Sequence, residues 1–458
     1  MRKILLSCLG LGLLEIGLAA DIENPVIRKL YEKGIFTKEE AIKLEKEIKN
    51  EHKKKIKKIE KKLVKHASVI NQKSPEFLLG KETGPNIKIR AFDNPDMYIK
   101  VGIRIQGTFE NYKVDYKDPT KSDIDTWDAY LRRTRLEIGA GFGKHTSFTM
   151  DIRNDKANYQ DKGEQEFNVG DAYLKIKKPF GTSLVNFKFY RAKIDVSRTE
   201  TVKSAWVVHY DRPHVADEAA QFISHNRRAT NAQIYGNWHK KIHYQLAFGD
   251  AVYSGKFYDA INHKSLSDYG GKIVEQDFFY GGKIILSPIP GWEETKRTET
   301  YFGVGKHVSV GIGYWRVPKI KFSLNSNTYE IDRTLLNYEF SAHYKGAFIQ
   351  AEYFDFDGVV KDWTAIDLEV GKSKGWYITG EYVFPNFYYI APFARYEEWK
   401  RWDSGEGDYK LKSTIFGLNW YLRGNTTKIG ISYQKDKYGK DIGDKDIDRL
   451  KFTSQWFF

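Results

Sequence analysis

The sequence predicts an all-β fold: a 16-stranded antiparallel transmembrane β-barrel with a short N-terminal α-helical, coiled-coil extension. Three observations predict this fold. Segments of alternating apolar and polar residues recur along the chain, the connections between them alternate between short and long, and the last segment ends on an aromatic residue. All three are typical of barrels that cross a bilayer with strands.

The first strand, 98–110, shows the period of two that defines the others. Ile103 and Ile105 alternate with Arg104 and Gln106, so the two sets lie on opposite faces of a strand. The segments with this pattern are 98–110, 127–140, 145–154, 166–176, 183–190, 230–238, 241–252, 275–286, 302–315, 333–344, 346–355, 374–384, 388–398, 411–421, 427–435 and 449–458.

Short and long connections between the strands alternate along the chain. Short ones include 141–144, 178–182, 239–240, 345–346, 385–386 and 423–425, and long ones include 155–165, 191–229, 253–274, 316–332, 356–373, 399–410 and 436–448. Short periplasmic turns and long outer loops are what an outer-membrane barrel requires, whereas a soluble sandwich has no reason for this order. The exception is 287–300, which is either a long turn or a sign of a misplaced strand, and 363–370 could be a further strand.

The last strand carries a more specific signal. Leu450, Phe452, Trp456 and Phe458 share one face, and the chain given ends on Phe458. Barrels inserted by the outer-membrane assembly machinery commonly end in this way, so we interpret Trp456 and Phe458 as the assembly signal.

The N-terminal region differs in kind from the rest. Residues 1–20 combine a basic start, an apolar stretch and small residues before Asp21, which predicts a signal peptide rather than the alternative, a membrane anchor. Residues 21–70 show helical spacing, with a capping box from Thr37 to Glu40 and a seam of apolar residues. This pattern predicts that the segment is either a periplasmic coiled coil or a plain solvated helix. Residues 71–97 are interpreted as a linker and 98–458 as the barrel domain.

Composition supports an exported barrel and excludes several chemistries. Cys8, the only cysteine, lies in the predicted signal, so disulfides and thiolate chemistry are excluded from the mature chain. The net charge is +14, but half of this excess lies in residues 1–80 rather than in the barrel. No zinc-finger spacing or RNA-binding motif accompanies the charge, so no nucleic-acid partner is predicted.

Several motifs resemble those of one family. The segment 128–139, DAYLRRTRLEIG, is similar to the second strand of the phosphate-selective porins (porins O and P), and 170–174, 375–381 and 417–422 fit the same family. The resemblance covers about 98–458 and the helical segment before it. It implies a 16-stranded barrel, a homotrimer, and a third outer loop that folds inward to narrow the pore; here that loop is 191–229.

The chain also departs from the family pattern. Entering the third loop it reads Phe189-Tyr190-Arg191-Ala192-Lys193, without the family's Gly and Pro, and no Gly follows Arg228. The barrel and the porin role therefore carry over, and phosphate preference does not carry over directly.

Alternation along the strands predicts which side chains line the pore. On 127–140 it places Leu131, Arg133, Arg135 and Glu137 in the lumen and Tyr130 toward lipid, with Arg132 outward or at a bulge. Arginine suits an anion path because its planar fork matches oxyanions and keeps its proton. The candidate pore-lining, anion-binding residues are Lys100, Arg104, Arg133, Arg135, Lys188, Arg191, Lys193, Arg198, Arg212, Arg227, Arg228 and Arg395, with Lys203 as a further cation of the loop.

A second interpretation stays open, because barrel walls are charged in any case. Luminal arginines often pair with neighbouring acids such as Glu137, Asp151 and Asp171 rather than select ions.

Enzyme chemistry is not predicted. Residues 371–375 match G-x-S-x-G, but a nucleophile elbow needs a strand before it and a helix after it. His209, Asp211, His214 and Asp217 share the third loop and could bind a metal, although loop histidines are more often polar surface. We predict no catalytic residues, no metal and no cofactor.

The function expected is an outer-membrane porin for passive diffusion of small solutes, favouring small anions, with phosphate as one candidate. The alternative is a general or cation-tolerant porin whose N-terminal helices tether the outer membrane to the cell wall. The expected location is the Gram-negative outer membrane, with the N-terminal segment in the periplasm. The expected partners are outer-membrane lipid and lipopolysaccharide, small anions, two further copies in a homotrimer, the assembly machinery and peptidoglycan.

Overall fold

A computed structural model gives the architecture. It describes part of residues 24–51, residues 87–90, residue 94 and residues 96–457, with gaps at 160–165, 290–297 and 304–305. The chain divides into two units, Met1–Ser74 and Pro75–Phe458. The predicted signal peptide, most of the coiled-coil seam and Phe458 lie outside the described residues.

In the first unit, the described residues between 39 and 51 are helical. The predicted capping box is present, since the Thr37 amide donates to Glu40 Oε2 at 2.9 Å and the Glu40 amide donates to Thr37 Oγ1 at 3.3 Å. Ile27 is buried there against Ile42, Leu44 and Ile48.

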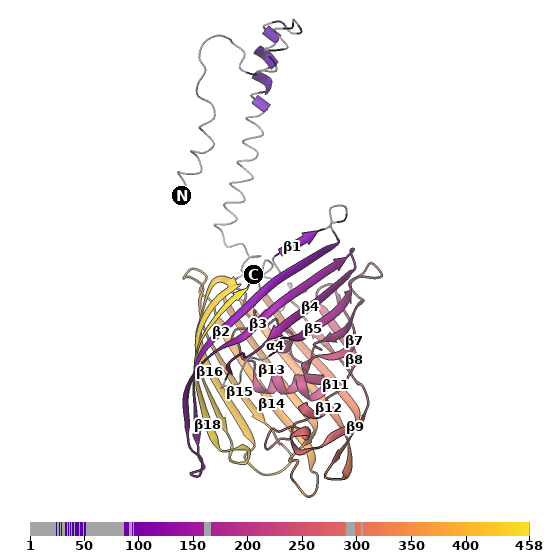
Figure 1. Cartoon of the computed structure of the whole chain (residues 1–458), viewed down its shortest axis with the longest axis vertical. Helices are drawn as coiled ribbons and strands as arrows, with labels where there is room; N and C mark the ends of the chain where they lie inside the picture. Colours follow the sequence, from indigo (N-terminus) through magenta and orange to yellow (C-terminus); the bar gives the residue numbers. More distant parts are fainter. Residues whose placement is uncertain are drawn as a thin grey trace. The chain divides into compact units, whose positions relative to one another are not determined.

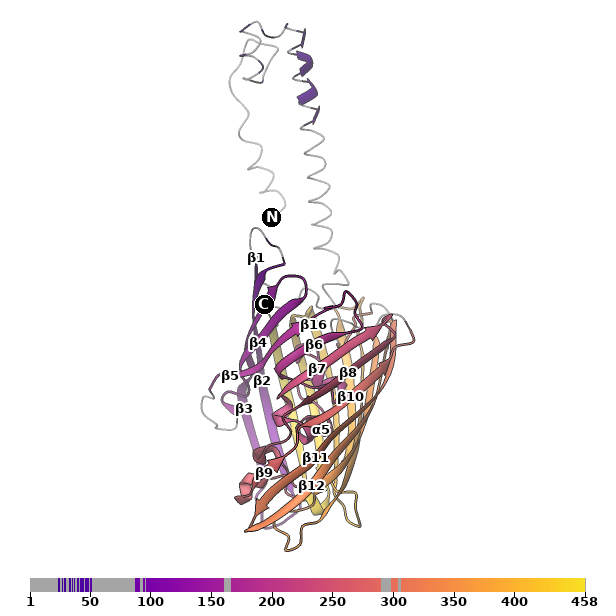
Figure 2. The same cartoon turned by 90° about the vertical axis from the view of Figure 1, so that its right-hand side faces the viewer.

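The second unit is a closed antiparallel barrel (Figures 1 and 2). Its strands are β1 (Ile87–Arg90), β2 (Tyr98–Tyr116), β3 (Ile124–Phe142), β4 (Thr146–Asn154), β5 (Asn168–Ile176), β6 (Asn186–Ala192), β7 (Ala229–Trp238), β8 (Ile242–Gly249), β9 (Lys272–Gln276), β10 (Phe279–Leu286), β11 (Lys306–Leu324), β12 (Asn327–Tyr344), β13 (Ala347–Val360), β14 (Val370–Tyr382), β15 (Ile390–Lys400), β16 (Lys410–Asn425), β17 (Thr427–Tyr438) and β18 (Lys445–Phe457). The helices are α4 (Arg198–Thr201) and α5 (His214–Ile223), with 3₁₀ turns η2 (His225–Arg227), η3 (Ser254–Lys256), η4 (Leu266–Tyr269) and η5 (Lys440–Ile442).

The wall contains sixteen strands, as predicted. β18 pairs with β2 from Lys445↔Tyr116 to Phe457↔Arg104, which closes the sheet. β9 and β10 pair with successive parts of β11 and therefore form one wall strand. β1 pairs with the first residues of β2 and lies within the predicted linker.

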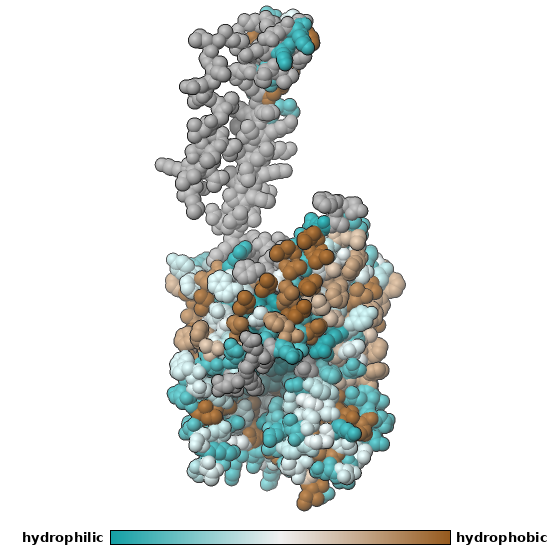
Figure 3. Space-filling model, in the orientation of Figure 1, coloured by the Kyte–Doolittle hydropathy of each residue, from teal (hydrophilic) through white to brown (hydrophobic). Residues whose placement is uncertain are grey.

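The two faces of the wall follow the predicted alternation. On β2, Ile103 and Phe109 are 48 % and 64 % exposed, whereas Arg104 and Gln106 are almost fully buried in the lumen. Apolar side chains gather on the half of the visible wall nearer the C-terminal end, and the opposite end is mainly polar (Figure 3). The barrel therefore has the outer apolar band that a bilayer requires.

Strand length varies around the barrel. β4 to β10 contain between 5 and 10 residues each, whereas β2, β3 and β11 contain 19 each. Since β9 and β10 form one wall strand, the low sector is β4 to β8, which is lower than the wall formed by β2, β3 and β11.

The predicted long connection 316–332 is wrong. β11 continues to Leu324, and β12 begins at Asn327 after a two-residue turn in which Asn325 and Ser326 have φ of 49° and 67°. Sequence alternation misses this hairpin because its outward face is polar, as the exposed Arg316–Asp332 pair at 3.1 Å shows. By contrast, the described residues 287–289 and 298–303 form no strand, and neither do residues 363–369.

The faces predicted for Tyr130 and Leu131 are also wrong. Gln106 pairs with Arg133 and Gly107 pairs with Leu131, so Arg132 is an extra residue at a β-bulge. Beyond the bulge the alternation reverses: Tyr130 is buried and donates to Glu110 at 2.8 Å, while Leu131 is 43 % exposed. Arg132 and Arg133 both reach the lumen.

Candidate pore constriction

Residues 193–228, between β6 and β7, fold into the barrel. α5 lies inside the lumen (Figure 2) and contacts β11 to β15. Its apolar face, which includes Val215, Ala219 and Phe222, joins a buried cluster with Trp315 and Phe354 of the wall. The inward loop, as we call 193–228, thus fills one side of the lumen with a hydrophobic core.

The start of α5 is fixed by a wall carboxylate. The Val215 amide donates to Glu397 Oε1 at 2.6 Å. An acidic group at a helix N-terminus is favourable because the first amides there have no partner within the helix.

Arginines of the wall hold the backbone of the loop. Arg133 donates to the Tyr210 carbonyl at 3.0 Å, and Arg395 donates to the Asp211 carbonyl at 2.8 Å. Arg132 forms an ion pair with the Asp211 carboxylate at 2.9 Å, and Lys451 donates to the same carboxylate. Burial raises the pKa of Asp211, but the charges of Lys451 and Arg132 outweigh it and hold that pKa well below its usual range.

A cavity of about 240 Å³ remains between the loop and the opposite wall. The wall side is formed by β2 to β5 and the loop side by residues between Lys193 and Arg228. Six cationic side chains and three carboxylates line it: Arg104, Arg135, Lys193, Lys203, Arg212 and Arg228, with Glu137, Asp151 and Asp171.

The charges of this cavity are arranged in pairs. Arg104 lies 2.9 Å from Glu137, and Arg228 lies 2.8 Å from Asp171. This is the pairing that the second interpretation of the sequence expects. Among the side chains that line the cavity, the basic ones still outnumber the carboxylates.

Acids just outside the cavity hold two of these arginines. Arg212 lies 3.1 Å from Glu200, and Arg135 lies 2.7 Å from Asp155. Burial raises the pKa of Glu200, but the charges of Arg212 and Arg227 outweigh burial. The pKa of Glu200 therefore lies below its usual range, and the carboxylate stays ionised.

Burial has the opposite effect on the two loop lysines. It lowers the pKa of Lys193 well below its usual range, and the charge of Arg212 adds to the effect. Burial also lowers the pKa of Lys203, against the attraction of Glu137.

The twelve predicted residues fall into groups. Those that line the cavity are Arg104, Arg135, Lys193, Arg212 and Arg228. Arg133 and Arg395 hold the loop, as described. Lys188 lies beside the cavity, with its ammonium 4.6 Å from the centre of the Tyr173 ring.

The remaining four lie elsewhere. Arg198 is fully buried and donates to Gln350 at 3.0 Å, and Arg227 pairs with Asp217 at 2.6 Å. Lys100 lies near the start of β2, opposite Gly139. Arg191 belongs to β6 rather than the loop and pairs with the exposed Thr230, which places it on the outward face.

Sequence reasoning missed Glu200, Asp155 and Lys451. Lys451 could have been found, because it alternates with Leu450 and Phe452, which share the other face of the last strand. Glu200 and Asp155 lie in connections, where no period indicates direction.

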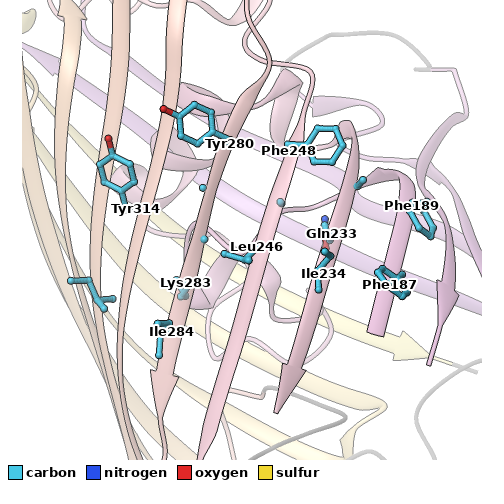
Figure 4. A pocket seen from close by; sticks show the side chains of 15 residues that line it. Phe187, Phe189, Gln233, Ile234, Leu246, Phe248, Tyr280, Lys283, Ile284 and Tyr314 are labelled. Carbon is cyan, nitrogen blue, oxygen red and sulfur yellow. The ribbon is translucent and has the colours of Figure 1, made fainter. Parts of the chain in front are cut away.

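A larger recess, of about 840 Å³, lies across β6 to β11 (Figure 4). Its exposed side chains include Ile234, Leu246 and Phe248, which belong to the outward face. This recess is therefore part of the lipid-facing wall and not of a solute path.

The loop histidines do not converge. His209 contacts Ser432 Oγ at 3.2 Å, and His214 lies 3.4 Å from Asp436. Within the described part of the chain, no group of three or more potential ligands could hold a metal ion. Ser373 of the G-x-S-x-G match lies inside β14 and donates to the Lys400 carbonyl at 2.9 Å, so the strand-turn-helix of a nucleophile elbow is not formed.

Across the described residues, no helix is long and apolar enough to cross a membrane. A closed sixteen-stranded wall, an apolar outer band and a loop folded into a charged lumen define a porin-like outer-membrane channel fold. The model of the family described as phosphate-selective porin O and P matches residues 99–270, which confirms the resemblance of the motifs at 128–139 and 170–174.

Other proteins are similar to this chain. An uncharacterized protein of Aquifex aeolicus (strain VF5) is 27 % identical over 409 residues, covering 83 % of this chain and 92 % of the relative. The outer membrane channel DcaP of Acinetobacter baumannii is 11 % identical, with a TM-score of 0.53, over 81 % of this chain and 99 % of that one. OprB of Pseudomonas putida is 10 % identical, with a TM-score of 0.51, over 79 % and 94 %. At these identities the two solved structures support the fold alone.

Proposed function

We propose that this protein is a water-filled outer-membrane channel for passive diffusion of small solutes, and that it favours anions. The observation that carries the proposal is the 240 Å³ cavity, in which six cations face three carboxylates. In a narrow passage with low-dielectric walls, such an excess concentrates anions and depletes cations.

Phosphate is one candidate solute. Arg104, Arg135 and Arg228 line the same cavity, and guanidinium groups can bind an oxyanion through two parallel hydrogen bonds. Each of these arginines already has a carboxylate partner, so a passing anion would share it rather than bind a vacant group.

Location and assembly complete the proposal. The barrel lies in a Gram-negative outer membrane, in contact with lipid and lipopolysaccharide, as a homotrimer inserted by the assembly machinery. The end with the short turns and the C-terminus faces the periplasm, which also contains residues 21–70, and peptidoglycan is a candidate partner there. The apolar band supports membrane insertion, and the family match supports the trimer.

The test is the reversal potential of the purified protein in a planar bilayer under a tenfold KCl gradient. An anion-selective channel moves the potential toward that of chloride, up to about 59 mV for ideal selectivity. A potential of the cation sign would refute anion preference, and a value near zero would favour the general porin. Phosphate is then added to see whether it reduces the chloride current.

A further inference from the structure

The described part of the connection between β10 and β11 enters the lumen from the end opposite the inward loop's attachment. Its residues Thr298, Glu299, Thr300, Tyr301 and Phe302 are each no more than 6 % exposed. A turn that only joins two strands lies at the rim and is exposed to solvent. Residues 298–302, which we call the inner segment, are instead buried inside the barrel.

Glu299 joins the inner segment to two separate parts of the inward loop. Thr199 donates to Glu299 Oε1 at 2.6 Å, and the Val208 amide donates to Glu299 Oε2 at 2.8 Å. The Glu299 amide donates in turn to the Trp206 carbonyl at 3.0 Å. One carboxylate therefore accepts hydrogen bonds from both the start and the middle of the inward loop.

Arg198 adds a second link between the same two segments. Its guanidinium donates to the Thr298 carbonyl at 3.3 Å and to the Tyr301 hydroxyl at 3.2 Å, while it also holds Gln350 of β13 at 3.0 Å. The loop, the inner segment and the wall meet at this side chain.

Aromatic contacts fix the inner segment against the wall. The Tyr301 ring stacks on the His343 ring of β12 with centroids 3.4 Å apart, and Phe302 meets Tyr421 of β16 edge to face at 4.9 Å. Tyr301 also shares a buried cluster with Phe393 of β15. The contacts thus extend over β12 to β16.

The cavity lies on the other side of the lumen. It is lined by β2 to β5 and the loop, and no residue of the inner segment or of β12 to β16 lines it. The loop and the inner segment, which reach the lumen from opposite ends, therefore fill one half of the barrel between them.

We propose that the inner segment is a plug that closes the half of the lumen along β12 to β16 and so directs solute through the charged cavity along β2 to β5. Glu299 is its positioning residue. The proposal rests on the proposed channel function, since it concerns the route that solute takes. It explains why selectivity can reside in one small cavity of a wide barrel: the other half is blocked from both ends.

The test compares single-channel conductance and reversal potential for the full chain and for Glu299→Gln, Glu299→Ala and Tyr301→Ala. Opening a second path of similar section raises conductance by about twofold and lowers anion preference, because the new path bypasses the cationic cavity. Matched controls are Glu330→Gln, in the outer hairpin, and Tyr388→Ala, in an exposed turn at the same end of the barrel; both retain the original values. Circular dichroism and the mobility of unheated protein on gels check that each variant is folded.

The outcomes separate the plug from the channel. If the parent protein conducts and the folded plug variants match it in conductance and ion preference, the plug is refuted and the channel stands. If the parent is silent and the plug variants conduct, the plug is supported as a complete closure. If all are silent, the channel function itself fails, and the plug with it.

Discussion

The ion pair between Glu137 and Lys203 allows the electrostatics of the cavity to be tested with two opposite changes. Both side chains line the cavity and are bonded to each other. Glu137→Gln raises the net charge of the cavity by one, and Lys203→Gln lowers it by one. Both variants break the contact between Glu137 and Lys203, and Glu137→Gln also removes the carboxylate partner of Arg104. Loss of the shared contact changes selectivity in one direction for both variants, whereas an electrostatic effect has opposite signs.

The magnitude follows from the size of the cavity. A sphere of 240 Å³ has a radius of about 4 Å, so a charged group on its wall lies about 7 Å from an ion at its centre. At that distance the interaction energy between the ion and one charge on the wall is about 0.6 kcal/mol in water, and about 0.25 kcal/mol after screening at physiological salt. Because anion and cation respond in opposite senses, their permeability ratio changes between about twofold and about sevenfold.

Reversal potentials in a KCl gradient measure this ratio. Glu137→Gln is expected to increase the preference for chloride and Lys203→Gln to reduce it. The control is Glu330→Gln on the outer hairpin, which is expected to leave the ratio unchanged. A shift of the same sign in both cavity variants, or none in either, would refute the reasoning.

Three further predictions concern stability and orientation. Burial opposes the charge on His214, but the charge of Asp436 outweighs burial and raises the pKa of His214. The stability that this ion pair contributes is complete below the unfolded pKa and is lost as pH rises through the higher folded pKa. Tm of the barrel therefore falls over that pH range, and the fall is absent in His214→Gln. Gly358 has a φ of 84°, and an added Cβ would lie 1.9 Å from the backbone of β12, so Gly358→Ala lowers the unfolding free energy by about 2 kcal/mol while Gly405→Ala, with nothing within 4 Å of its added Cβ, changes it less in denaturant titration. An epitope inserted between Asn325 and Ser326 is bound by antibody on intact cells and one between Lys345 and Gly346 is not; the reverse pattern would overturn the proposed orientation.

Most of the wall could be predicted because lipid enforces the period of two. Wherever a strand crosses the apolar band, as on β2 from Ile103 to Phe109, each outward residue is apolar and each inward one is not. Outside that band polar residues occur on both faces of a strand, so the alternation does not predict the β11–β12 hairpin. One extra residue at Arg132 was enough to exchange the faces of Tyr130 and Leu131.

The site could be predicted less completely than the wall. Alternation and loop position identified all six basic side chains of the cavity, but pairing joins residues far apart in the sequence, such as Arg228 with Asp171 and Arg212 with Glu200. The inner segment had no signal beyond an unexplained long turn. Residues such as Thr298 and Glu299 have no period, and only the folded loop gives them partners.

The low sector of the wall has a consequence for the surrounding bilayer. A tilted strand of eight residues, such as β8, rises only about 19 Å, whereas the apolar band of an outer-membrane barrel is about 25 Å tall. Lipid beside β4 to β8 must therefore thin locally, at a cost of a fraction of a kcal/mol per ångström of mismatch. This cost falls when another protein surface replaces lipid along that sector, so hydrophobic mismatch favours association of the barrel through its lowest side.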